Sequence, residues 1–467
     1  LTRKEYKYIL QSSASEQDLE DNICNAACIF PEEYEFETCG FAGLNEYVAN
    51  LIQDLSGFKD IQVALDPELL GKVFENLLGS YNPETSETAR KDSGSFYTPR
   101  EIVNFMVDET VKEFLLKKLI VANPRTANVL ELKMKLENLV GYYTEDIQVT
   151  EEEKEIIVKA INECKVLDPA CGSGAFPMGI LQKLVYILHK LDPDNSIWKR
   201  TQVEKIQKQM STLMMNVDNK TERQEALEEI NNRFDENMAY PDYARKLYLI
   251  ENCIYGIDIQ PIAIQISKLR CFISLVVDET VDPTKENFGI IPLPNLESKF
   301  VSANTLVDLR TKDDSKSLFY NKKIEDLREK LENIRHSLYT VRSLKTKNKR
   351  KEEYKETCAQ IVEILKQDGW GSEIAIKLAA WNPFSKNTSS KWFDAEWMFD
   401  VDSGFDIVIG NPPYMRVQEI QNTQPDAKLY YEKRYPASTG GGAYDLANVF
   451  FERAIEFVKV NGVCSYI

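Results

Sequence analysis

One stretch restricts the fold of this chain more than any other: an apolar strand, a glycine-rich turn and an amphipathic helix in immediate succession. Val166–Asp168 is a short apolar run that ends in an acid, and Gly172 and Gly174 follow shortly after it. Apolar side chains then recur at intervals of three and four, which predicts a helix: Met178, Leu181, Leu184, Val185 and Leu188. This succession is typical of an open α/β sheet, in which ligands bind where the strands end.

The turn itself indicates which ligand such a sheet would bind. Glycines let a ligand approach the backbone, and the amino end of the following helix favours a carboxylate or a phosphate. The turn has neither the lysine of a Walker loop nor the spacing of a dinucleotide fingerprint. Asp168 would repel a phosphate but suits the ammonium group of an amino acid, which favours S-adenosylmethionine as cofactor. A tight strand–helix turn without a ligand is the alternative. The candidate cofactor-binding residues are Asp168, Ala170, Cys171, Gly172, Ser173 and Gly174.

A second predicted strand, Ile254–Ile259, also carries an acid near its end. In a βαβ unit such an acid accepts hydrogen bonds from the ribose hydroxyls of a bound nucleoside, so Asp258 and the adjacent Ile259 are candidate cofactor residues. Asp258 could equally cap the helix that Pro261 is expected to start. Both interpretations remain open from the sequence.

The segment Asn411-Pro412-Pro413-Tyr414 follows a third apolar run, Phe405–Gly410, and is expected at the carboxyl end of a buried strand. The side-chain oxygen of Asn411 and the main-chain oxygen of Pro412, whose direction Pro413 fixes, could accept the two protons of an aromatic amine. Tyr414 offers a flat face on which a planar base could stack. These four are the candidate catalytic residues, for methylation of an exocyclic amine. A simple proline turn after a strand is the alternative.

With these motifs the chain resembles the N6-adenine DNA methyltransferases, and most closely those fused into type IIG (type IIS) restriction–modification enzymes. The resemblance starts near Asp66 and reaches the last residue. Gly94–Glu101 is similar to the family's first cofactor-contacting segment, and it precedes the glycine-rich turn, as in the gamma order of motifs. The resemblance implies that the substrate is an adenine flipped out of double-stranded DNA. It also implies cofactor-binding roles for Tyr97, Thr98, Asn304 (where the family usually carries an acid) and Phe450.

The resemblance implies an α/β fold with the Rossmann-like sheet of S-adenosylmethionine-dependent methyltransferases. We expect a helical amino-terminal domain over residues 1–93 and a catalytic domain over residues 94–467. Two helical insertions are expected in the catalytic domain, at about 192–243 and 313–369. In the second insertion, apolar residues at helical spacing predict two antiparallel helices joined near residues 345–350.

The resemblance also leads us to expect that this chain is a fragment. The family's sheet continues for two more strands beyond the strand expected near residues 462–467, so we expect a sheet truncated after its fifth strand. The DNA-recognition domain would follow further on. No paired-acid-and-lysine nuclease motif is evident before Asp66, so a nuclease, if one exists, is expected to precede Leu1.

Composition narrows the class of protein further. The nine cysteines are scattered and only two histidines occur, which argues against a disulfide framework, histidine-based hydrolysis and a metal site. We find no signal peptide and no apolar run long enough to span a membrane, so we expect a cytoplasmic enzyme. The net charge of −17 is unusual for a DNA-binding protein. This charge is compatible with DNA binding if a basic DNA-recognition domain is missing from the chain, or if the acidic residues lie on a face remote from the DNA. A third explanation is that nucleic acid is not the substrate.

Two other functions remain open from the sequence. Methyltransferases that act on a protein glutamine amide, or on a guanine amine in RNA, carry a similar Asn-Pro-Pro-Tyr. They are usually shorter and lack the Tyr97-Thr98-Pro99 segment and the long insertions. Alternatively, the chain is a non-catalytic module of a DNA-defence complex that its helical pairs help to assemble.

Overall fold

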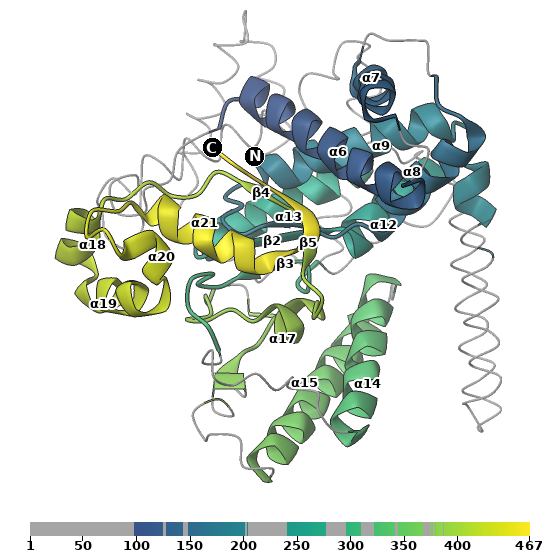
Figure 1. Ribbon diagram of the computed structural model, residues 1–467. Helices are drawn as coiled ribbons and strands as arrows, with labels where there is room; N and C mark the ends of the chain where they lie inside the picture. The colour runs from purple at the N-terminus through teal and green to yellow at the C-terminus, as the bar shows by residue number, and fades with distance from the viewer. Residues whose placement is uncertain are drawn as a thin grey trace, which may run out of the picture. The chain divides into compact units, whose positions relative to one another are not determined.

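The part of the chain that the structure describes is a sheet with helices on both faces (Figure 1). The predicted helical domain over residues 1–93 lies outside the described residues, as do Tyr97 and most of the predicted insertion at 192–243. Apart from a few positions between them, the computed structural model describes residues 98–124, 128–142, 148–200, 241–276, 296–309, 322–340, 344–367 and 387–467.

The sheet has five parallel strands, and its chain path reverses direction in the middle. Their spatial order is β3 (Phe300–Ser302), β2 (Ile254–Asp258), β1 (Val166–Asp168), β4 (Phe405–Gly410) and β5 (Val458–Tyr466). The chain builds outward from β1 to β3 and then returns to add β4 and β5 on the other side. This reversal between β1 and β4 is the topological switch point of an open α/β sheet. The expected α/β fold with a Rossmann-like sheet is therefore confirmed.

The apolar runs noted in the sequence form the inner strands. All six residues of β4 are buried, which explains why its sequence is an apolar run interrupted only by Asp406. β2 ends at Asp258, so Ile259 lies just beyond the strand. The strand expected near residues 462–467 is the second half of β5, which starts earlier, at Val458.

Helices on one face of the sheet (the upper face in Figure 1) are α6 (Arg100–Ala122), α9 (Ala175–Leu191), α12 (Pro241–Asn252) and α13 (Pro261–Val276). Two more, α7 (Val129–Val140) and α8 (Glu151–Glu163), pack on α6. Pro99 immediately precedes α6, and the main-chain N–H groups of Ile102 and Val103 donate to its carbonyl oxygen. Helix α6 also contacts β4 and β5, and Thr98, two residues before its start, bonds Asn411 just after the end of β4.

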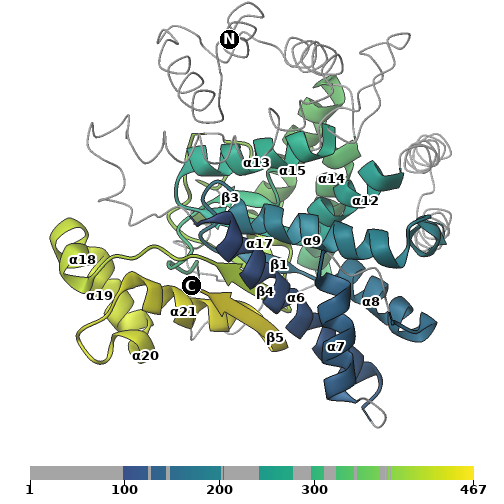
Figure 2. The ribbon, with the colours of Figure 1, turned by 90° about the horizontal axis from the view of Figure 1, so that it is seen from above.

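The opposite face carries α14 (Lys322–Thr340), α15 (Leu344–Gln367) and the short α17 (Ala395–Phe399). Figures 1 and 2 show α14 and α15 side by side, and their short connection makes them antiparallel. Helix α14 ends at Thr340 and α15 starts at Leu344, so the junction lies a few residues before the predicted position near 345–350. Both helices place apolar side chains in the same core as β1, β2 and β4.

Three short helices follow the Asn411–Tyr414 segment: α18 (Val417–Thr423), α19 (Pro425–Arg434) and α20 (Pro436–Thr439). The chain then enters α21 (Leu446–Phe457), whose first turn is capped by the Asp445 side chain. A second apolar cluster joins these helices to the loop after β3 through Leu306, Met415, Ile420, Tyr431, Tyr435 and Phe450.

Candidate active site

The glycine turn after β1 leaves one carboxylate oxygen without a partner. Asp168 is 2% exposed, and its Oδ1 accepts the Ala170 N–H at 3.1 Å. Its Oδ2 is buried and has no hydrogen-bond partner among the described residues. Burial raises the pKa of Asp168 well above its usual range, and the nearby Asp258 carboxylate adds to the effect. A cationic group would satisfy this oxygen, so the site fits the ammonium group expected from the sequence.

The two glycines of this turn serve different needs. Gly172 has φ +54°, and a Cβ atom added there would have no heavy atom within 4 Å, so its backbone faces open space. Gly174 has φ +87°, and an added Cβ would lie 2.9 Å from Ser267 Oγ on α13. The first glycine therefore leaves room for a ligand, whereas the second permits close packing between helices.

The other turn residues are held from β2 and α13. The Cys171 N–H donates to the Ile257 carbonyl oxygen at 2.8 Å, and Arg270 Nη1 donates to the Ser173 carbonyl oxygen at 3.1 Å. The turn is therefore rigidly supported on the side away from its open face. Ala170 packs against the second apolar cluster.

Asp258, at the end of β2, holds two backbone groups. Its Oδ2 accepts the Gly172 N–H at 2.9 Å, and its Oδ1 accepts the Gln260 N–H at 2.8 Å. The bond from Gly172 joins the end of β2 to the glycine turn. The bond from Gln260 closes a local turn just before α13. Burial raises the pKa of Asp258, and these two hydrogen bonds act against that rise. Ile259 is 57% exposed next to it.

The end of β4 lies directly against the end of β1. A Cβ atom on Gly410 would lie 2.6 Å from Asp168 Oδ1, so only glycine fits this position. Asn411, the next residue, donates from Nδ2 to Thr98 Oγ1 at 3.0 Å. Its Oδ1 is buried and accepts no hydrogen bond from any described residue. The structure therefore brings Thr98, the glycine turn and the Asn411 amide together.

The rest of the Asn411–Tyr414 segment turns gradually outward. Pro412 is buried, and Pro413 is partly exposed. Tyr414 is 37% exposed, and its hydroxyl donates to the main-chain oxygen of Ile467 at 2.7 Å. The tyrosine ring is thus anchored at its hydroxyl end.

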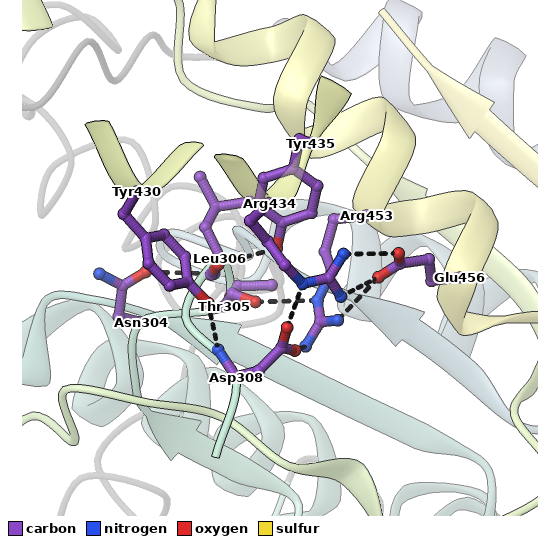
Figure 3. Close-up of polar contacts among 9 residues, drawn as sticks. All are labelled: Asn304, Thr305, Leu306, Asp308, Tyr430, Arg434, Tyr435, Arg453 and Glu456. Carbon is purple, nitrogen blue, oxygen red and sulfur yellow. Dashed lines mark hydrogen bonds and ion pairs between the residues drawn. The ribbon is translucent and has the colours of Figure 1, made fainter. Parts of the chain in front are cut away.

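Asn304 follows β3 and folds back onto its own turn (Figure 3). Its Oδ1 accepts the Leu306 N–H at 3.1 Å. The neighbouring Thr305 donates from Oγ1 to the Pro169 carbonyl oxygen at 2.7 Å. The second bond joins the loop after β3 to the turn after β1. Phe450 on α21 is 8% exposed and packs in the second apolar cluster, beside Leu306.

A network of four charged side chains holds the loop after β3 in place (Figure 3). Asp308 pairs with Arg434 and with Arg453, and both arginines also pair with Glu456. Arg453 Nε additionally donates to the Thr305 carbonyl oxygen at 3.1 Å. The network therefore links the segment after β3 to α19 and α21.

One further residue, Tyr466, belongs to this edge of the sheet and was not singled out in the sequence. It is the partner of Gly410 in the pairing of β4 with β5. Within the described part of the chain its buried hydroxyl has no hydrogen-bond partner, and burial raises its pKa well above the usual range. The only sequence signal is an aromatic residue at a strand end. Asp168, Asn411 and Tyr466 thus each present an unsatisfied polar atom at neighbouring strand ends.

The five parallel strands with helices on both faces form an α/β fold of the kind that methyltransferases have. Residues 252–467 match the family model described as "Eco57I restriction-modification methylase". A protein of Methanocaldococcus jannaschii, named as a candidate type II restriction enzyme and methyltransferase, is 25% identical over 276 residues. That alignment covers 56% of this chain but 19% of the relative, so the chain spans about a fifth of that relative's length. The resemblance to restriction–modification methyltransferases is therefore confirmed.

Two features are absent from the described residues. None of the helices in these ranges is long and apolar enough to cross a membrane. In the same ranges, no group of three or more His, Cys, Asp or Glu side chains could hold a metal ion.

Proposed function

We propose that this chain transfers a methyl group from S-adenosylmethionine to the N6 amine of an adenine in DNA. One observation carries the proposal: the unpartnered Asn411 Oδ1 lies at the end of β4, and the unpartnered Asp168 Oδ2 lies at the end of the adjacent β1. The first is a hydrogen-bond acceptor suited to an amine. The second is suited to a cation. A methyltransferase needs both kinds of group on either side of one reaction centre.

On the cofactor side, we assign contacts to the carboxylate oxygen that lacks a hydrogen-bond partner and to the open backbone of the glycine turn. Asp168 would hold the ammonium group, and the backbone at Gly172 would accept close approach of the ligand. Asp258 and Asn304 would contact the ribose and the adenine, with Phe450 and Ile259 beside them. When bound, S-adenosylmethionine supplies an electrophilic methyl group, so the protein contributes mainly placement.

On the substrate side, the residues of the Asn411–Tyr414 segment would hold the base. Asn411 Oδ1 and the Pro412 carbonyl oxygen would accept hydrogen bonds from the two N–H groups of the amine. These bonds would direct the nitrogen lone pair toward the reaction centre. Tyr414, which is partly exposed, would stack on the flipped base. A strong base is not required, because the amine proton becomes acidic only after the nitrogen has attacked.

At the scale of the chain, we propose that residues 94–467 form the catalytic domain and residues 1–93 a helical domain before it. The match to a restriction–modification family supports double-stranded DNA as the partner. The name of the relative supports a type II system, in which modification accompanies restriction.

The test is the Asn411→Ala variant of the full-length protein. Transfer of tritium from labelled S-adenosylmethionine to unmethylated genomic DNA should fall about 100-fold or more, because a hydrogen bond to developing charge is lost. Cofactor affinity should stay close to that of the wild type. Undiminished transfer by this variant would contradict the mechanism.

The same assay identifies the substrate. Label in N6-methyladenine of DNA is the expected outcome. Label in RNA or in a protein glutamine would instead favour the other two methyltransferase classes, and cofactor binding without any transfer would indicate a non-catalytic module.

A further inference from the structure

We propose that Thr98 is a positioning residue, whose hydroxyl sets the orientation of the Asn411 amide. This inference rests on the proposed function, because it assigns a task to the amide that would hold the target amine. Thr98 and Asn411 are 313 residues apart in the chain, and Asn411 Nδ2 donates to Thr98 Oγ1 at 3.0 Å. Thr98 was expected to contact the cofactor, and this bond places its hydroxyl on the substrate side instead.

The need for such a residue follows from the chemistry of an amide. A primary amide has a donor end and an acceptor end of nearly the same shape, and the two exchange when the group rotates by half a turn. The acceptor end must face the target amine, because the donor end would meet the hydrogens of that amine. Thr98 Oγ1 engages the donor end, and the acceptor Oδ1 is left without a partner among the described side chains.

The surroundings of Thr98 make it a fixed reference point for this amide. Thr98 is 8% exposed and directly precedes Pro99, the N-cap residue of α6. Two lysines further along α6 bind the sheet: Lys118 Nζ lies 2.9 Å from Asp406 Oδ1 on β4, and Lys117 Nζ donates to the Gly462 carbonyl oxygen on β5 at 2.9 Å. The helix is therefore attached to the two strands whose ends border the site.

Partial burial of the pair makes the bond matter energetically, because Thr98 is buried and Asn411 is half-buried. An amide N–H₂ group that loses its acceptor where water has limited access pays part of the cost of that lost hydrogen bond. Without the Thr98 hydroxyl, the amide would gain by rotating until its donor end found another partner, and the acceptor would then no longer face the amine. The expected defect is therefore in the rate of transfer and not in cofactor binding.

The experiment compares Thr98→Val and Thr98→Ser in the full-length protein, with single-turnover transfer and cofactor titration. Thr98→Val keeps the shape but removes the acceptor, and should lower the transfer rate about 10-fold with cofactor affinity changed less than about 3-fold. Thr98→Ser restores a hydroxyl and should recover most of the rate. Thr110→Val is the matched control, because Thr110 lies on the same helix, is 2% exposed, and its hydroxyl has no partner among the described residues.

A double-mutant comparison distinguishes this inference from the proposed function. If Thr98 acts through the amide, Thr98→Val should cause no further loss in an Asn411→Ala background. Full transfer by Asn411→Ala would end the proposed function itself. A strong defect in Asn411→Ala together with a normal rate in Thr98→Val would overturn only the positioning role. Loss of cofactor affinity at an unchanged rate would also overturn it. If Thr98→Val lowers the melting temperature, the variant Thr98→Ala, which removes the same acceptor, takes the place of Thr98→Val in each comparison.

Discussion

Asp168 shows, at the scale of a single residue, how a proposed binding site can weaken the fold. Its carboxylate is buried at the end of β1, and Oδ2 has no partner among the described residues. Burial raises the pKa of Asp168 in the folded protein well above its unfolded value, so the folded state binds this proton more tightly. Stability is therefore lost as the pH rises from the unfolded pKa through the folded pKa.

This leads to a prediction for Asp168→Asn, which stays neutral at every pH. At pH 7 the variant should melt at the same temperature as the wild type or higher, because no buried carboxylate has to ionise. Its affinity for S-adenosylmethionine should fall about 10- to 100-fold, since it loses a charged hydrogen bond. Thermal denaturation and calorimetric titration check the two effects.

The pH dependence of binding separates this explanation from a general disturbance. Wild-type affinity for the cofactor should increase as the pH rises through the raised pKa of Asp168, and that of Asp168→Asn should not. Asp194→Asn, at an exposed turn position, is the control. A variant that is less stable yet binds the cofactor normally would rule out the assigned role.

At the scale of elements, the ion network of Asp308, Arg434, Arg453 and Glu456 joins α19 and α21 to the loop after β3. Arg434 makes a two-bond contact with Glu456, at 2.8 and 2.7 Å. Burial opposes ionisation of Glu456, but the hydrogen bonds from the two arginines outweigh it and lower the pKa to about 2. The stabilisation from this carboxylate is therefore present above its ordinary pKa and is lost as the pH falls toward about 2.

We predict that Glu456→Gln lowers the melting temperature at pH 7 by about 2–4 °C, as expected for the loss of one or two charge-assisted hydrogen bonds. The difference from the wild type should close as the pH is lowered toward 2, because the wild-type carboxylate then becomes neutral as well. Melting curves over pH 2–7 measure this. Glu352→Gln, which removes an exposed pair with Lys355, should have little effect at any pH. A constant difference across this range would show that charge is not the cause.

At the scale of the whole molecule, α14 and α15 are part of the main core. Ile324, Leu331, Ile361 and Leu365 are buried in the same apolar cluster as Leu167 of β1 and Phe405 of β4. Arg335 Nη2 on α14 also donates to the Trp397 carbonyl oxygen at 2.8 Å. A helical pair that shares its core with the sheet should not unfold independently of it.

Ile361→Ala tests this coupling. The change leaves a cavity in a fully buried position and should destabilise the protein by about 2–5 kcal/mol. Scanning calorimetry should show the transition of the sheet moving to lower temperature, with no separate early transition of the helical pair. Leu130→Ala, at a side chain that is 71% exposed on α7, is the matched control. An early transition confined to the helices would mean that the insertion is an independent unit.

Local patterns made part of this protein predictable. The strands β1, β2 and β4, the glycine turn and the Asn411–Tyr414 segment all follow from residue types that act on their immediate neighbours. The contact of Thr98 with Asn411 could not be predicted, because the two are 313 residues apart. The close approach of Gly410 to Asp168 and the network around Glu456 were missed for the same reason.

The amino-acid sequence by itself determined which segments become strands, where the chain turns and which chemical groups stand at the strand ends, because periodicity and turn preference are local properties. Only the tertiary structure decided which of those groups meet and which oxygens stay without partners. That outcome depends on the order of strands in the sheet and on the packing of α6 and α21 beside it, and each arises from contacts between segments far apart in the chain.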